Sequence, residues 1–188
     1  MAVLVYIESE ENKFKKTAYE ALSYGKALAD KMGVKVSGLV LNCSDTDSLK
    51  KYGADKIITI DNPDFEKFSS KKYSHALAEV IKSENSSVVI LSSSADSKFL
   101  GAHLSGIIDS SYVSNVVGIP ESISPFVVKR TCFTNKAFSS TEMNDGLRII
   151  SVSSNSFGMI EKFNDSTVES FNVGKTGEHK QRKQFTEQ

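Results

Sequence analysis

Short apolar runs alternate with stretches of helical periodicity over the first part of the chain. Four of these runs predict buried strands, because parallel strands covered on both faces are almost continuously apolar. They are residues 2–8 (AVLVYIE), 34–41 (VKVSGLVL), 54–60 (ADKIITI) and 87–91 (SVVIL). Apolar and small positions at helical spacing predict a helix over residues 13–32 and a helical turn at residues 48–53. A further helix carries Tyr73, Leu77, Val80 and Ile81 on one face and ends near Asn85.

Residues 88–117 are the centre of this prediction, because they combine a strand, a serine loop, a helix and the beginning of a strand at residues 113–119. The apolar stripe of the helix consists of Leu100, Leu104, Ile107 and Ile108. Small residues form two faces suited to close packing, Gly101 with Ser105 and Ala102 with Gly106. Ser94 or Asp96 is expected to cap the helix. Turns between a strand and a helix often bind ligands, but this loop lacks the flanking glycines or bases that a ligand-binding or catalytic loop needs. We therefore expect a scaffold element whose only ligand would be a protein surface.

The pattern changes after residue 119. Pro120 and Pro125 interrupt it, and the runs 126–133 and 147–153 follow without a long helix between them, which is typical of an antiparallel hairpin or meander. A turn is expected at residues 142–146 and an edge strand at residues 167–173. The prediction is one α/β domain over residues 1–173, a three-layer, doubly wound, mainly parallel Rossmann-like sheet with a small antiparallel extension near the C-terminus. Residues 174–188 have almost no apolar side chains and are predicted to be a disordered tail or linker stub.

The composition excludes several classes of partner. Twenty-three basic and twenty-three acidic residues give a formal net charge of zero, without a block of like charge that could follow a phosphate backbone, so nucleic acid is not expected. The apolar runs are shorter than a bilayer span and no signal peptide is recognised, so membrane insertion and secretion are not expected. Cys43 and Cys132 form no CxxC pair and are expected to be buried, reduced thiols. The isolated histidines do not predict a metal site.

No catalytic motif is complete. Residues 174–176 (GKT) resemble the end of a P-loop, but Glu169 stands where its first glycine belongs. Residues 8–10 (ESE) follow the first strand, where a dinucleotide site needs glycines and where carboxylates repel a pyrophosphate. The serines at 92–94 and 151–156 lack an adjacent base, so capping and turn formation are expected of them. No catalytic residue is predicted.

Five segments in this order resemble one known family. They are residues 2–8 (AVLVYIE), 36–42 (VSGLVLN), 52–61 (YGADKIITID), 90–119 (ILSSSADSKFLGAHLSGIIDSSYVSNVVGI) and 126–138 (FVVKRTCFTNKAF). Together they resemble the N-terminal domain of the electron-transfer flavoprotein alpha subunit. The positions that match the family's serine loop and following segment are residues 92–98 and 114–116 (SNV). Arg130, Phe133, Lys136 and Ala137 match its arginine-led strand, whereas Thr131 replaces a proline and Asn135 a glycine.

The resemblance implies an electron carrier subunit rather than an enzyme, with a fold similar to the adenine-nucleotide alpha-hydrolases. In this family FAD is held mainly by a second domain, so no cofactor is expected for the isolated domain and no FAD ligand is assigned in this chain. The domain would pack against the beta subunit and support the flavin domain. Electrons would pass from flavin dehydrogenases, as in fatty acid oxidation, to a quinone oxidoreductase. The implied location is the bacterial cytoplasm or the mitochondrial matrix. Because the resemblance ends in the linker before the flavin domain, we expect either a piece of a longer subunit or a short gene product.

Arg130, Asn135 and Lys136 are the candidates for a loop that faces the partner or the flavin edge. The alternative is an ordinary hairpin with solvated charges. Asparagine at position 135 is a mild departure, because it is the next best residue after glycine in a left-handed conformation. A hypothesis from another class is a stand-alone, universal-stress-type module that binds an adenine nucleotide. Such modules carry a glycine-rich phosphate loop late in the chain, whereas this sequence has only scattered glycines such as Gly146 and Gly158.

Overall fold

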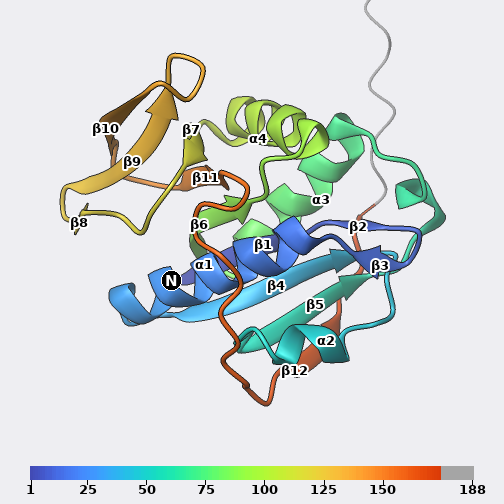
Figure 1. The fold of residues 1–188 in the computed structure, drawn as a ribbon. Coiled ribbons are helices and arrows are strands. Elements are labelled where there is room, and N and C mark those ends of the chain that lie inside the picture. The colour runs from blue at the N-terminus through green and yellow to red at the C-terminus, as the bar shows by residue number, and fades with distance from the viewer. Residues whose placement is uncertain (175–188) are drawn as a thin grey trace, which may run out of the picture.

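The apolar runs form the centre of one large sheet, as the computed structural model of this protein shows for residues 1–174, the part of the chain that it describes (Figure 1). The parallel strands are β1 (Ala2–Ile7), β4 (Lys35–Leu41), β5 (Lys56–Ile60), β6 (Ser86–Leu91), β7 (Ser111–Val116), β11 (Arg148–Val152) and β12 (Thr167–Ser170). They are arranged in the order β7-β11-β6-β1-β4-β5-β12. Every residue of β1 is buried, because helices cover both faces of the sheet.

Helices cover the sheet in the three layers that the sequence predicts. Helix α1 (Lys16–Met32) packs on one face, where it shares a core with Val3, Val5 and Ile7. Helices α3 (Ser70–Ser83) and α4 (Ala95–Ile108) pack on the other face, against Leu4 and Tyr6. Two short helices, α2 (Asp47–Lys50) and the 3-10 turn η1 (Pro63–Phe65), lie in connections. Within residues 1–174, no helix is long and apolar enough to cross a membrane.

Helix α1 begins three residues later than the sequence predicts. Residues 9–14 form a small hairpin instead, made of β2 (Ser9–Glu10) and β3 (Lys13–Phe14). Its two central residues, Glu11 and Asn12, have φ angles of 49° and 58°. Positive φ at both positions is the geometry of the tight hairpin turns whose twist matches that of the strands. The local turn therefore overrides the helical periodicity at the start of the helix.

The antiparallel extension is confirmed, but the strand pairing predicted within it is wrong. Strand β9 (Phe126–Cys132) pairs with β10 (Ala137–Met143), with β7 and with the short β8 (Ser122–Ile123). The second predicted partner, β11, lies instead in the parallel sheet between β6 and β7. Its last four residues are buried, as a central strand requires, whereas only Met143 is buried in β10. A mostly exposed strand lacks the apolar pattern by which it could be recognised.

The connection from β11 to β12, residues 153–166, crosses the outer side of α1 and carries the chain to the far edge of the sheet (Figure 1). There β12 pairs in parallel with β5, so the predicted edge strand is confirmed with a shorter extent. After the end of β12, the backbone N–H of Gly174 donates to Glu79 Oε2 of α3 over 3.0 Å. The rest of the predicted tail, residues 175–188, lies outside the described residues.

Candidate functional site

The three residues predicted to form a partner interface occupy two separate positions on the β9–β10 hairpin. Arg130 is half-buried in β9, and its Nη2 donates to Ser114 Oγ of β7 over 3.5 Å. Its Nε is buried and has no hydrogen-bond partner among the described residues. Asn135 and Lys136 are exposed in the turn between the strands. Asn135 has a φ angle of 61°, so the left-handed conformation expected for this position is present.

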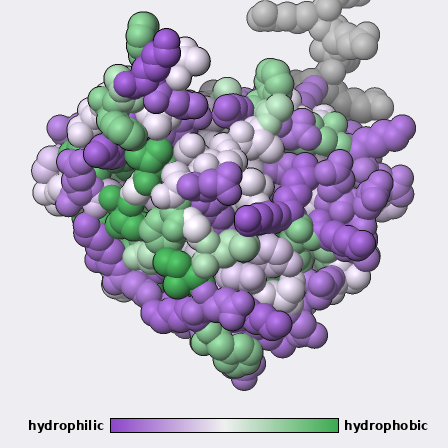
Figure 2. All heavy atoms as spheres, in the orientation of Figure 1, coloured by the Kyte–Doolittle hydropathy of each residue, from purple (hydrophilic) through white to green (hydrophobic). Residues whose placement is uncertain are grey.

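Two exposed aromatic side chains on the same hairpin were not among the predicted site residues. Phe133, at the start of the turn, is 79% exposed, and Phe138, in β10, is 61% exposed. Lys129 Nζ lies 4.7 Å from the ring centroid of Phe138, within the range of a cation–π contact. Figure 2 shows hydrophobic residues at the end of this hairpin and along the adjoining side of the molecule, whereas the opposite side is mostly hydrophilic. The sequence signal was a pair of phenylalanines in an otherwise polar segment.

The serine loop that follows β6 binds a carboxylate of its own chain. Glu8 follows β1 and is buried, and its Oε2 accepts hydrogen bonds from Ser92 Oγ at 2.6 Å and Ser97 Oγ at 3.2 Å. Its Oε1 lies 2.7 Å from Lys15 Nζ. Burial by itself would raise the pKa of Glu8, but the hydrogen bonds from Lys15 and Ser92 and the positive charge of Lys15 outweigh it, and the pKa is lowered. Ser94 also caps α4 by accepting from the backbone N–H of Ser97 at 3.0 Å, as predicted. Ser94 therefore has the capping role that the sequence predicts, whereas the hydrogen bonds from Ser92 and Ser97 to Glu8 were not predicted.

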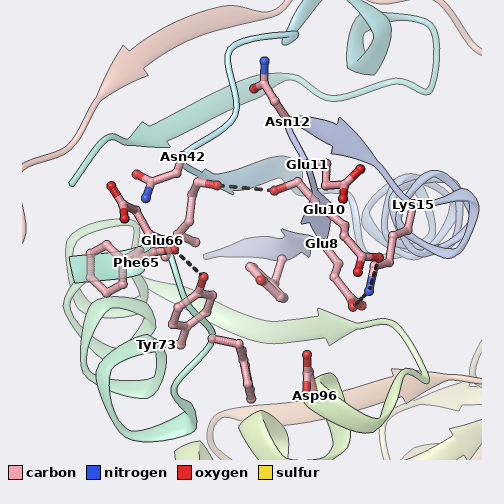
Figure 3. A pocket seen from close by; sticks show the side chains of 14 residues that line it. Glu8, Glu10, Glu11, Asn12, Lys15, Asn42, Phe65, Glu66, Tyr73 and Asp96 are labelled. Carbon is pink, nitrogen blue, oxygen red and sulfur yellow. Dashed lines mark hydrogen bonds and ion pairs between the residues drawn. The ribbon is translucent and has the colours of Figure 1, made fainter. Parts of the chain in front are cut away.

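A cleft of about 490 Å³ lies beside Glu8, where β1 and β4 end (Figure 3). One wall is aromatic and consists of Tyr6, Phe65, Phe68 and Tyr73. The Tyr73 ring packs edge-on against the other three, with centroid distances of 5.1 Å to Phe68, 5.4 Å to Phe65 and 6.2 Å to Tyr6. The hydroxyl of Tyr73 donates to the backbone oxygen of Phe65 over 2.8 Å, which fixes this wall.

The rest of the cleft is strongly acidic. Its charged side chains are Glu8, Glu10, Glu11, Glu66, Asp96 and Lys15, a net formal charge of −4. Figure 3 shows Glu8, Glu10 and Lys15 on one side, across the cleft from Phe65, Glu66 and Tyr73, with Asp96 on a third side. Carboxylates at the ends of these strands oppose the binding of a phosphate, as the sequence indicated for the first turn.

The cysteine prediction holds for only one thiol. Cys43 is buried, but Cys132 at the end of β9 is half-buried, because the hairpin extends past the helices that cover the main sheet. Within residues 1–174, no group of three or more His, Cys, Asp or Glu side chains is arranged to hold a metal ion.

Comparison with known proteins assigns the chain to a family. The family model of the electron transfer flavoprotein domain matches residues 3–176. The chain is 24% identical over 179 residues to electron transfer flavoprotein subunit alpha of Bacillus subtilis, which covers 93% of this chain and 54% of that protein. It is 30% identical over 102 residues to acryloyl-CoA reductase electron transfer subunit beta of Anaerotignum propionicum, and the alignment covers 53% of this chain and 28% of that protein. The chain is 24% identical over 119 residues to Protein FixB of Clostridium saccharobutylicum, and the alignment covers 62% of this chain and 36% of that protein.

The chain thus spans about half the length, or less, of these relatives. The match of the family model across almost the whole described domain agrees with the segments that carried the resemblance. The chain belongs to the electron transfer flavoprotein domain family, and its resemblance to the N-terminal domain of the alpha subunit is confirmed.

Proposed function

We propose that this chain acts as the N-terminal scaffold domain of the alpha subunit of an electron-transfer flavoprotein. In this role it packs against a beta subunit and supports a flavin domain. The complex carries electrons from flavin dehydrogenases to a quinone-linked acceptor, and the domain itself is not a catalyst. The observation that supports this proposal is the family match over residues 3–176 together with the alpha-subunit relative aligned over 93% of the chain.

FAD does not fit the cleft of this domain. The pyrophosphate of FAD is anionic, and the carboxyl ends of β1 and β4 present a cleft with a net formal charge of −4. Glycine-rich turns, which let a backbone approach a pyrophosphate, are also missing after β1, where residues 8–10 are Glu-Ser-Glu. The same lining counts against the alternative of a nucleotide-binding module. In the proposed complex, FAD is therefore bound outside this domain.

The β9–β10 hairpin is the part of the surface that suits a protein partner best. Phe133 and Phe138 expose large apolar areas, and such anchors carry much of the binding energy in protein interfaces. Lys129 lies over the Phe138 ring and Lys136 is exposed in the turn, so the hairpin also carries positive charge. The partner surface that complements this hairpin is an apolar patch with acidic residues at its rim. Arg130 supports the hairpin from β9 through its contact with Ser114.

Aromatic substitutions on the hairpin test the proposed interface. Phe133→Ser and Phe138→Ser are each expected to weaken binding to the beta subunit by about tenfold or more, because each removes an apolar anchor. Phe163→Ser is the matched control, since Phe163 is 75% exposed on the β11–β12 connection, away from the hairpin. Isothermal titration calorimetry with the purified beta subunit measures the three affinities.

Charge substitutions distinguish the interface from the simpler hairpin with solvated charges. Arg130→Ala and Lys136→Ala should weaken the complex, and the loss of Lys136 should also reduce the salt dependence of the association rate. If all four hairpin variants bind the beta subunit like the unchanged chain, the hairpin is not the interface.

A further inference from the structure

Strand β10 is an open edge of the main sheet. It pairs with β9 on one side, and no strand of residues 1–174 pairs with its other side. All seven of its residues are in register with β9 without a bulge, and only Met143 is buried. Figure 1 shows this hairpin at one end of the molecule. The outer backbone N–H and C=O groups of β10 are therefore free to pair with another strand.

This edge lacks the features by which proteins prevent edge strands from pairing. Protected edges are usually short, bulged or occupied by proline and several charged residues. Strand β10 has the sequence AFSSTEM, which contains no proline and has Glu142 as its only charge. The opposite edge strand, β12, is four residues long and carries Glu169 in an ion pair with Lys56. Strand β10 is therefore the edge of this sheet that is suited to pairing.

A single register pairs the whole of β10 with a second copy of itself. When a twofold axis relates two antiparallel strands, it passes through one residue and its copy, and Ser140 is the central residue of the seven. In this register Ala137 faces Met143 of the second copy. Phe138 faces Glu142 of the second copy, and residues that face one another in this way have Cβ atoms about 4.5–5.5 Å apart.

The charges of the hairpin are complementary in this register. Phe138 and Glu142 are exposed on one face of β10, and Lys129 of β9 shares that face because it pairs with Ser140. The Nζ of Lys129 lies over the Phe138 ring, 4.7 Å from its centroid. Neither Lys129 nor Glu142 forms an ion pair within residues 1–174. Pairing of two copies brings Glu142 of the second copy to the other side of this ring, and the twofold axis repeats the attraction.

We propose that two copies of this chain pair through β10 into an antiparallel dimer with one continuous sheet. The twofold axis at Ser140 closes the assembly, because it uses the open β10 edge of both copies. The dimer forms when the beta subunit is absent. Because the proposed beta-subunit interface is the same hairpin, the two partners exclude each other. Dimerisation is measured with the chain alone, so its outcome does not depend on the proposed function.

Sedimentation equilibrium of the full chain over a range of concentrations tests the dimer. The expected result is a monomer–dimer equilibrium without larger species. Lys129→Glu and Glu142→Lys should each weaken the dimer by about tenfold or more, because the symmetry converts two attractions into two repulsions. Lys67→Glu and Glu66→Lys make the same charge changes at exposed positions outside the hairpin and should dimerise like the unchanged chain.

Combining the two hairpin substitutions distinguishes this register from any other association. The variant with both Lys129→Glu and Glu142→Lys should regain most of the lost affinity. An equimolar mixture of the two single variants should also dimerise, because each reversed charge then meets its opposite. Diluted to the monomeric state, all variants should unfold like the unchanged chain, since the substituted side chains are exposed.

Three results would overturn the proposed dimer. The first is a chain that stays monomeric at about 1 mM, and the second is association into species larger than a dimer. The third is a pattern of affinities in which the combined substitutions and the mixture fail to restore dimerisation, or in which the control variants lose as much affinity as the hairpin variants.

Discussion

Glu20 is a buried carboxylate on α1 that holds the chain where it leaves β11. Its Oε1 accepts the backbone N–H groups of Phe157 and Gly158 at 2.9 Å each, and its Oε2 accepts that of Asn155 at 2.9 Å. Burial by itself would raise the pKa of Glu20, but these backbone donors outweigh it, and the pKa is lowered from its ordinary value of 4.5. The ionised carboxylate therefore stabilises the start of the β11–β12 connection.

Glu20→Gln should lower the free energy of unfolding by about 1–3 kcal/mol, because an amide donor then faces backbone N–H groups. Urea denaturation measures the loss. Glu142→Gln removes a charge of the same kind from an exposed position on β10 and should leave stability unchanged. Equal losses in the two variants would contradict the role of Glu20.

The contribution of Glu20 should also depend on pH in one direction. Its pKa is lower in the folded than in the unfolded chain, so the stabilisation is fully present above the unfolded value of 4.5 and is lost as the pH falls through the folded value. The stability gap between the unchanged chain and Glu20→Gln should be constant from about pH 7 to about pH 5.5 and narrow below about pH 4.5. Urea unfolding across this range measures it, and a gap that widens in acid would refute the assignment.

Helix α4 shows how closely an element can approach the sheet. A Cβ atom at Gly101 would lie 2.7 Å from the Tyr112 ring and 3.0 Å from Leu91 Cδ1, whereas one at Gly106 would have no neighbour within 4 Å. The two small faces predicted for this helix therefore differ. Gly101 packs against the sheet as expected, but Ala102 and Gly106 are exposed.

Two alanine substitutions on α4 should have opposite effects. Gly101→Ala should destabilise the fold by about 1–3 kcal/mol through overpacking against Tyr112. Gly106→Ala should stabilise it by about 0.5–1 kcal/mol, because alanine favours a helix over glycine and meets no obstacle there. Thermal unfolding of both variants compares them, and a Gly101→Ala variant as stable as the unchanged chain, or more stable, would show that α4 does not pack closely at Gly101.

Apolar pattern predicted the elements that are buried and missed those that are not. The continuous runs of β1, β4 and β6 were recognised because helices cover both faces of these strands. Strand β10 was missed, since it is stabilised mainly by backbone pairing with β9 and buries only Met143. For the same reason β11 was assigned to the antiparallel hairpin, although its buried run Ile149–Val152 is that of a central parallel strand.

For the molecule as a whole, the order of the sequence segments indicated the family, but nothing in the sequence indicated the cleft at the ends of β1 and β4. Its aromatic and acidic residues come from the end of β1, the β2–β3 hairpin, the region around η1 and α3, and the start of α4. These residues form no motif of regular spacing in the sequence, because they come together only when β1 pairs between β4 and β6 in the folded sheet. Likewise Arg130 and Asn135 are only five residues apart, yet Arg130 contacts Ser114 of the sheet, whereas Asn135 is exposed in the turn.

In the proposed function, this domain assembles with a beta subunit and does not itself hold the flavin. The most direct test is to mix the purified chain with FAD alone and with the beta subunit alone, and to follow complex formation by size-exclusion chromatography with flavin absorbance. We expect an equimolar complex of the chain with the beta subunit and no retention of FAD by the chain. Stoichiometric FAD on these residues alone, or the absence of any complex, would contradict it.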